Sequence, residues 1–316
     1  MNRHALGPEG RSGSGLAGFF MLTFALTWAA WLLALWWVQD RRLSSPLDSP
    51  VGTGLVYLGI FAPALAALVQ TARRGPRGAI GALLMRLVAW RVGVWPYVVA
   101  LTYIAAVKLS AAAVLRIVDG AWPAFGPEPI LLLVAATVGS LVSGGQVGEE
   151  LGWRGYALPR MGQRWGLGPA SIVLGVIWAV WHLPLFYMPG ADTFGQSFPL
   201  YLVQVTGLSV AVAWVFGHTG GSLLVVMLMH ASLNNMKGIV PGVARPPMAP
   251  WLPDAPLFGW VTAAVIWVAA AGFLLEMRRW PWSRRGCTAL FPPLTLPGSV
   301  HPPPGIPRPG GARRSG

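Results

Sequence analysis

The sequence predicts an all-α polytopic membrane protein with about eight transmembrane helices. Hydrophobic residues make up 54% of the 316 residues and charged residues only 10%, whereas soluble domains carry roughly a quarter charged residues. The mean hydropathy is +0.57. The apolar residues fall into runs of about 20, the length that an α-helix needs to cross the hydrocarbon layer of a membrane. Basic and acidic loops alternate between these runs, as they do in multi-pass proteins.

The expected spans share an apolar stretch of transmembrane length and are separated by polar loops. They are 16–38, 54–72, 94–116, 129–150, 167–188, 198–216, 222–240 and 257–275. The first run is longer than the hydrophobic core of a secretory signal, so we interpret it as a retained helix. The third run carries Lys108, an expensive residue inside lipid.

The loop charges support this count and predict an orientation. Every second loop is basic, beginning with the five arginines between spans two and three: Arg73, Arg74, Arg77, Arg86 and Arg91. We expect the protein in the plasma membrane. Because basic loops stay on the cytoplasmic side, we expect both termini in the cytoplasm. With a net charge of +13, the protein is expected to bind anionic lipids through these loops. Nucleic acid is not expected as a partner, since the sequence has no basic stripe with interleaved aromatic residues.

These elements divide the chain into five predicted regions. A cytoplasmic tail (1–15) precedes the first transmembrane helices (16–128), and a core (129–240) is followed by a last helix (257–282) and a disordered tail rich in proline and glycine (286–316). Within the second region, residues 80–91 have an apolar excess with scattered arginine, which indicates either a helix lying in the membrane interface or a plain linker. The only cysteine, Cys287, excludes an intrachain disulfide and a CxxC motif.

Two adjacent acids stand at the end of the fourth expected span. Glu150 and Arg154 are four residues apart and share one helix face, so they are expected to form an ion pair. Glu149 points about 100° away from that face and is available as a general base. The competing interpretation is a helix end at which headgroups solvate both acids.

Two further expected spans carry histidine. His182 follows Trp178 by four residues on one helical stripe, and His230 precedes Asn234 by four residues on another. Alone, His182 is compatible with a packing residue, and His230 with Asn234 is compatible with hydrogen bonding between helices. One shared polar pocket explains Glu149, His182 and His230 together more economically than three separate explanations.

These segments resemble the CAAX-prenyl-protease-2-like membrane peptidases, the type II CAAX or Abi family (also CPBP). The resemblance covers roughly residues 130–240 and rests on three motifs in matching order: Glu149-Glu150-Leu151-Gly152-Trp153-Arg154, then Trp178 with His182, then His230 with Asn234. It implies an intramembrane endopeptidase that hydrolyses a peptide bond near the membrane surface with activated water. Glu149 would be the general base, His182 would hold the water, and His230 with Asn234 would form the oxyanion hole. Glu150, Arg154 and Trp178 would support the site.

Two alternatives stay open at this point. The resemblance implies no cofactor, but Glu149, His182 and His230 could instead offer three ligands to zinc with water as the fourth, although no HExxH motif is present. A protein without catalysis, either a membrane scaffold or a proton-linked carrier, could also use intramembrane Glu and His. A peptide or protein substrate at the membrane is the expected partner, and the sequence does not predict an oligomeric state.

Overall fold

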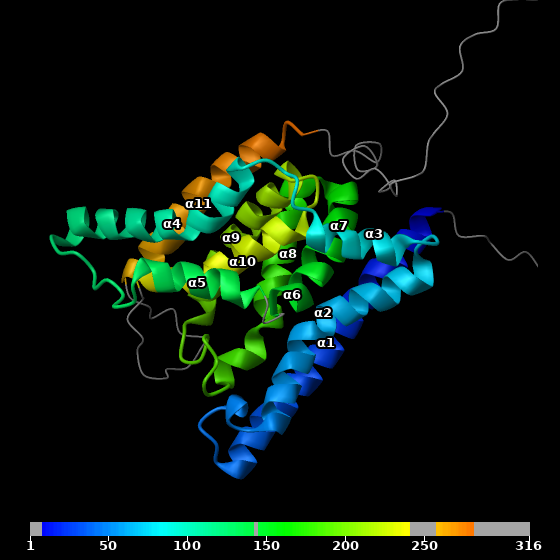
Figure 1. Ribbon diagram of the computed structural model, residues 1–316, viewed down its shortest axis with the longest axis horizontal. Coiled ribbons are helices and arrows are strands. Elements are labelled where there is room, and N and C mark those ends of the chain that lie inside the picture. The colour runs from blue at the N-terminus through cyan, green and yellow to red at the C-terminus, as the bar shows by residue number, and fades with distance from the viewer. Residues whose placement is uncertain (1–7, 142–144, 241–256, 281–316) are drawn as a thin grey trace, which may run out of the picture.

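The computed structural model describes residues 8–141, 145–240 and 257–280, in which all regular secondary structure is helical and no strand is present (Figure 1). The longer helices, in chain order, are α1 (Pro8–Arg41), α2 (Pro50–Arg74), α4 (Trp95–Asp119), α8 (Leu167–Trp181), α9 (Phe198–His218) and α11 (Leu257–Met277). The shorter ones are α3 (Ala79–Met85), α5 (Ile130–Ser140), α6 (Gly145–Gly152), α7 (Leu158–Trp165) and α10 (Leu223–Asn235). Short turns of helix accompany them: η1 (Pro46–Asp48), η2 (Arg86–Val88), η3 (Trp153–Ala157), η4 (Leu183–Tyr187) and η5 (Met236–Ile239).

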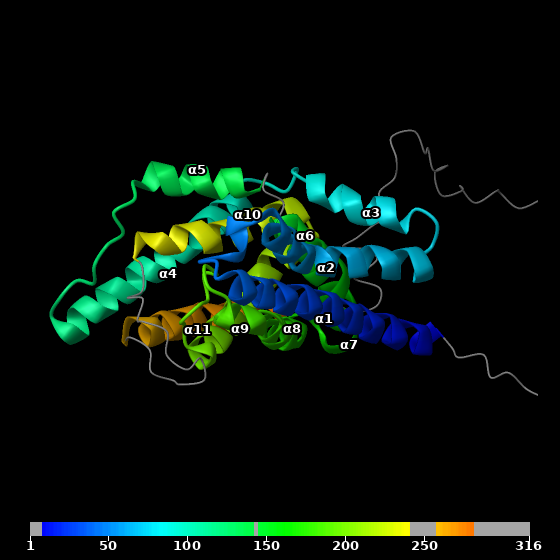
Figure 2. The same ribbon diagram turned by 90° about the horizontal axis from the view of Figure 1, so that it is seen from below.

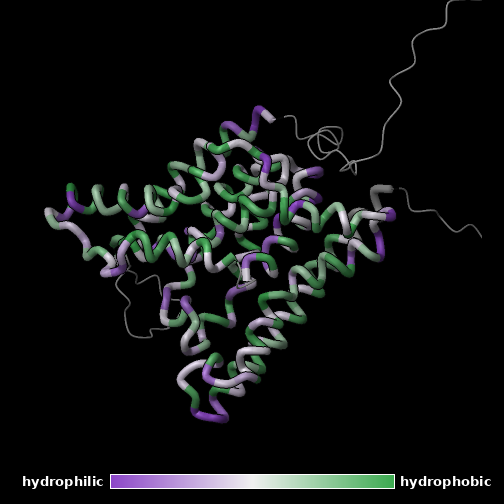
Figure 3. Tube along the Cα trace, in the orientation of Figure 1, coloured by the Kyte–Doolittle hydropathy of each residue, from purple (hydrophilic) through white to green (hydrophobic). Residues whose placement is uncertain are grey.

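The predicted fold class is confirmed: the protein is a polytopic, all-helical membrane protein. Within the described residues, six helices are long and apolar enough to cross a membrane, and a seventh span results if the pair α5 and α6–α7, which bend by 60° from each other, is counted as one. In Figure 3 the hydrophobic colours follow the helices, and the hydrophilic colours gather at the loops and helix ends. This distribution suits a bundle whose outer surface faces lipid.

The eight expected spans correspond to eight helical segments, but two of them differ from the expectation. The fourth span, 129–150, is not one straight helix, because α5 ends at Ser140 and α6 begins at Gly145 in a new direction. The seventh, 222–240, contains α10, which has only 13 residues and is therefore about 20 Å long. An apolar run fixes neither a bend nor the residue at which a helix ends.

The region 80–91 contains α3 and η2, which together form a short apolar helix over Ala79–Val88. A plain linker is therefore wrong for its secondary structure, while its place in the membrane interface stays a prediction. The predicted tail at 286–316 and residues 1–7 of the predicted N-terminal tail lie outside the described residues. The division of the chain into five regions and the cytoplasmic placement of both termini stay predictions as well.

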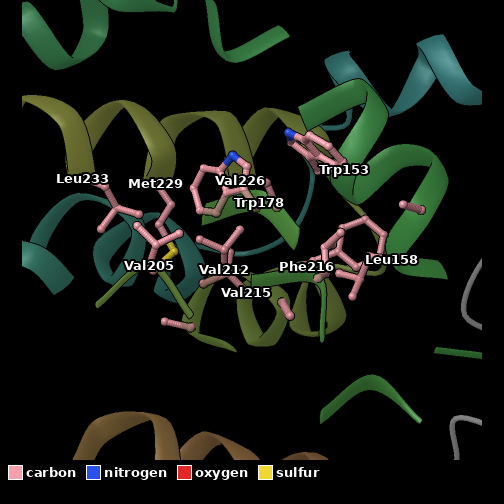
Figure 4. Packing of buried hydrophobic residues seen from close by; sticks show 14 of the residues in the cluster. Trp153, Leu158, Trp178, Val205, Val212, Val215, Phe216, Val226, Met229 and Leu233 are labelled. Atoms are coloured by element: carbon pink, nitrogen blue, oxygen red, sulfur yellow. The ribbon is translucent and has the colours of Figure 1, made fainter. Parts of the chain in front are cut away.

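The helices pack around α6 and α10. Seen from below, these two helices lie between α3 and α5 on one side and α8, α9 and α11 on the other (Figure 2). Helices α1 and α2 form an antiparallel pair along the bundle (Figures 1 and 2). Figure 4 shows buried side chains of η3, α7, α8, α9 and α10 packed together at the centre. Because α10 contributes ten buried residues out of 13, the side chains of its His230 and Ser232 lie inside the protein rather than in lipid.

Candidate active site

Two glycines let the helix that carries the paired acids approach α2 closely. A Cβ atom on Gly148 would lie 2.7 Å from the carbonyl oxygen of Ile60, and one on Gly152 would lie 2.6 Å from the backbone of Pro63. Real side chains do not fit at such distances, so only glycine allows the two backbones to touch. Small residues four apart are a common means of close helix packing in membranes. The contact fixes α6 at the level of Glu149 and Glu150.

The ion pair expected from the spacing of Glu150 and Arg154 is present. Arg154 donates from a guanidinium nitrogen to Oε1 of Glu150 at 2.8 Å, and both side chains are fully buried. Arg154 lies in the π-helical turn η3 between α6 and α7. Such turns are rare and occur frequently at functional sites. Because both charges are buried, removing either side chain would leave the other charge without a partner, which is strongly destabilising.

His230 joins this ion pair instead of standing apart from it. Its Nδ1 lies 2.8 Å from the same Oε1 of Glu150, and because a carboxylate oxygen only accepts, Nδ1 is the donor. The side chain is buried, and among the described residues its Nε2 makes no hydrogen bond. Glu150 therefore positions a histidine as well as an arginine, which spacing along one helix does not reveal.

Trp178 connects the two acids to both histidines. Its indole Nε1 donates to Oε2 of Glu149 at 2.8 Å, and the guanidinium of Arg154 lies over its ring at 4.3 Å. The ring centroid of Trp178 is 5.6 Å from that of His182 and 5.4 Å from that of His230. The three motifs from separate helices thus meet around one indole, and the structure brings every expected site residue of these motifs into one region.

His182 lies at the end of α8, and one of its two ring nitrogens forms a hydrogen bond to the backbone. Its Nδ1 lies 2.8 Å from the carbonyl oxygen of Trp178, which accepts, so Nδ1 carries a proton and Nε2 of the neutral ring keeps a lone pair. Trp181 and Trp31 support the ring from the side, since the centroid of Trp181 lies 4.6 Å from that of His182 and 4.6 Å from that of Trp31. Trp31 in helix α1 therefore helps to place His182, which lies 151 positions away in the sequence.

A cavity of about 690 Å³ gives access to this cluster. Glu149, Trp178, His182, His230 and Asn234 all line it. Glu149 is 9% exposed, and Asn234 presents an exposed side chain that makes no hydrogen bond in the described part of the chain. The cavity combines apolar walls with convergent polar and charged side chains, as ligand sites usually do.

The alternative zinc site is not assembled by these residues. No group of three His, Cys, Asp or Glu side chains within residues 8–141, 145–240 and 257–280 lies close enough to hold a metal ion, and Glu149, His182 and His230 are all in that part. Oε2 of Glu149 accepts from Trp178, and Nδ1 of each histidine donates to another acceptor, so the atoms left to bind a metal are the other oxygen of Glu149 and the two Nε2 atoms. In the described part of the chain these three side chains do not converge into a three-ligand metal group.

Three cavity residues were missed by the sequence analysis or left without a role. Tyr201 from α9 makes a T-shaped contact with His182 at 5.6 Å between ring centroids. Lys108, the costly lysine of α4, lines the cavity and lies 4.9 Å from the ring centroid of Phe258. Lys237 pairs with Asp192 at 3.0 Å where the cavity opens. The only sequence signal was the presence of Lys108 inside an apolar run, which is explained by the polar cavity beside it.

Comparison with known proteins agrees with these motifs. Residues 127–236 match the family described as type II CAAX prenyl endopeptidase, Rce1-like. Over 116 residues the chain is 30% identical to CAAX prenyl protease 2 of Methanococcus maripaludis, a match that covers 35% of this chain and 39% of that protein. The matched part is thus well under half the length of the relative. The residues that match the family, 127–236, contain Glu149, Glu150, Arg154, Trp178, His182, His230 and Asn234.

The site and the comparison concern the same segment. The helices from α5 to the start of η5 supply the paired acids, both histidines and the central indole. The protein is therefore a multi-helix membrane protein whose residues 127–236 are similar to the Rce1-like type II CAAX prenyl endopeptidase family.

Proposed function

We propose that this protein is an intramembrane endopeptidase in which Glu149 activates the water that attacks a peptide bond. The observation that carries the proposal is the hydrogen bond from Trp178 to Glu149 beside the cavity. It holds one carboxylate oxygen, while the other makes no hydrogen bond to the described residues. A carboxylate fixed in this way can accept a proton from water, a step that contributes ~10²–10⁴-fold to the rate.

His182 would orient the same water. Because its Nδ1 donates to the carbonyl of Trp178, the lone pair on Nε2 is free to accept a hydrogen bond. Water held by an acid and an imidazole on one wall of the cavity has its own lone pair directed at the substrate carbonyl. No Ser or Cys nucleophile is needed in this scheme.

Asn234 and His230 would stabilise the oxyanion that forms on attack. The neutral amide of Asn234 donates without any change of charge. Nε2 of His230 can donate only if the ring carries both protons, and the carboxylate of Glu150, 2.8 Å from Nδ1, would offset that positive charge. One donor in an oxyanion hole typically contributes ~10²–10³-fold. Glu150, Arg154 and Trp178 would keep these groups in place without touching the substrate.

The experiment compares peptides with new termini in cells that express wild-type protein, Glu149→Gln or Glu276→Gln. Glu276 is a matched control, because it too accepts a hydrogen bond of 2.8 Å from an indole, that of Trp214, and it does not line the cavity. We expect termini that appear with wild-type protein and Glu276→Gln and disappear with Glu149→Gln. Unchanged cleavage in Glu149→Gln would refute the assignment. Proton-coupled flux in liposomes that is present with wild-type protein and lost in Glu149→Gln, with no cleavage in any sample, would favour the carrier instead.

A further inference from the structure

The outermost described residues that line the cavity lie at one end of the helix bundle, which we call the acidic end: residues 40–49, 116–129, 188–197 and 236–240. Contacts hold these connections together. Lys237 pairs with Asp192 at 3.0 Å, and the amide of Gly126 donates to the carbonyl of Ile239 at 3.1 Å. The loop 188–197 also packs against the α1–α2 connection, because a Cβ atom on Gly190 would lie 2.5 Å from Oγ of Ser45.

The mouth of the cavity is formed by this end. Its outer lining consists of consecutive residues of the loop before α9 together with the residues that follow α10: Asp192, Thr193, Phe194, Gly195, Gln196, Ser197, Lys237 and Gly238. None of the lining residues belongs to α3, α7 or the connections beside them. A peptide that reaches Glu149 must therefore enter from the acidic end or from lipid beside it.

The opposite end, which we call the arginine-rich end, comprises residues 73–94, 158–167, 217–223 and 276–280. Ser222 donates to the carbonyl of Ala89 at 2.6 Å, and a Cβ atom on Gly217 would contact the ring of Trp280, so these segments lie together. Tyr156 and Arg74 both lie next to Gly15, which places the start of α1 on this side.

The two ends differ strongly in charge. The described side chains of the arginine-rich end include one acid, Glu276, and many bases: Arg73, Arg74, Arg77, Arg86, Arg91, Arg160, Arg164, Arg278 and Arg279. At the acidic end the acids at least balance the bases: Asp40, Asp48, Asp119, Glu128 and Asp192 against Arg41, Arg42, Arg116 and Lys237. An excess of Arg and Lys in short loops marks the cytoplasmic side.

We propose that the cavity opens on the non-cytoplasmic side of the membrane. The inference about substrates rests on the proposed peptidase function. The substrates are then peptide segments exposed on that side and not the cytoplasmic tails of proteins. The orientation follows from the charges, and the position of the mouth follows from the lining residues. Neither observation alone gives the side from which substrate enters.

Thiol labelling tests the orientation without any need for activity. The protein is made with Cys287→Ser, which removes the only cysteine of the sequence, and then with Gln196→Cys at the mouth or Arg164→Cys at the end of α7. Both side chains are exposed, so they are matched in accessibility. Intact cells are treated with a maleimide that does not cross membranes, and permeabilised cells show whether each thiol is reactive in the folded protein.

We expect labelling of Gln196→Cys in intact cells at least tenfold above that of Arg164→Cys, and equal labelling of both after permeabilisation. A third variant, Leu200→Cys, places a thiol on the cavity wall and is expected to react from the same side as Gln196→Cys. Preferential labelling of Arg164→Cys, or equal labelling of both in intact cells, would overturn the proposal.

The peptides that depend on Glu149 provide a separate check on the substrate. Their cleavage sites are expected in segments on the non-cytoplasmic side, and sites confined to cytoplasmic segments would overturn the inference about substrates. Failure of the peptidase function itself would look different. No termini would then depend on Glu149, while the labelling pattern would still report the side on which the cavity opens.

Discussion

The indole Nε1 of Trp178 donates a hydrogen bond of 2.8 Å to Oε2 of Glu149, and this contact joins α8 to α6 at the floor of the cavity. The same indole stacks beneath Arg154, whose charge is paired with Glu150. One side chain thus aligns the proposed base and braces the buried ion pair. The ring and its N–H group have separable effects, because phenylalanine keeps an aromatic ring but lacks the donor.

Replacing Trp178 by Phe should lower peptidase activity without unfolding the protein. A hydrogen bond to a charged group contributes ~1.5–3 kcal/mol, so the expected loss is about 10- to 100-fold in kcat/KM. The measurement is the rate of cleavage of a substrate peptide found by its dependence on Glu149. The effect should fall on kcat more than on KM, since the contact orients the base and not the substrate.

Trp214→Phe is the matched control for this variant. Trp214 also donates an indole N–H to a carboxylate at 2.8 Å, that of Glu276, and it lies outside the cavity. Its replacement should cost a similar amount of stability and leave kcat/KM within about twofold of wild type, because no group of the site depends on it. Equal losses of activity in both variants would show that the Trp178 contact has no special role.

Gly152→Ala should lower the melting temperature, because its methyl group would meet the backbone of Pro63 in α2. Overpacking of this kind costs ~1–3 kcal/mol. Gly54→Ala in α2 is the control, since a Cβ atom there meets nothing within 4 Å, and alanine favours the helix. Thermal unfolding followed by circular dichroism in detergent separates the two. A melting temperature for Gly152→Ala at or above that of Gly54→Ala would contradict the close helix contact.

Glu150→Gln should destabilise the protein far more than Asp192→Asn does. The first change leaves Arg154 buried without its partner, which costs ~3–5 kcal/mol, and it also weakens the contact of His230. The second removes a solvent-exposed ion pair with Lys237, which contributes below ~1 kcal/mol. The yield of monodisperse protein after purification and its melting temperature measure both effects. Comparable stability of the two variants would mean that the buried pair is not structural.

A strong chelator should leave the activity unchanged. Within the described residues, Glu149, His182 and His230 do not form a group that could hold a metal ion. Cleavage is measured after prolonged incubation with chelator, alongside elemental analysis of purified protein. Loss of activity that returns on adding Zn²⁺, together with one metal ion per chain, would show a metal-dependent reaction.

The sequence was sufficient to predict the fold class and most spans, because an apolar run of about 20 residues has few structural alternatives. Five of the expected spans match single long helices, α1, α2, α4, α9 and α11, and a sixth matches α8 together with η4. The sequence did not predict the bend before α6 or the early end of α10. Both depend on packing: the glycines at 148 and 152 draw α6 onto α2, and apolarity continues into η5 after the helix of α10 has ended.

The candidate site was predictable within each helix but not between helices. Spacing places Glu150 beside Arg154, and this ion pair is present. The contact of Glu150 with His230 joins residues 80 positions apart, and no local pattern contains it. The support of His182 by Trp31 and Trp181 likewise depends on how α1 lies against α8. Catalytic roles for these residues stay proposals until the variants are measured.

The shortness and burial of α10 have a consequence for how the protein is made. At about 20 Å the helix does not reach across a hydrocarbon layer of ~30 Å, and ten of its 13 residues are covered by protein. Such a segment is not stable in the bilayer on its own. It can therefore insert only by packing against neighbouring helices that are already in place. We therefore expect His230 to reach the site late in biogenesis, after the translocon has released α1 to α9, and nascent chains halted before α10 to hold an unfinished but already lipid-embedded scaffold.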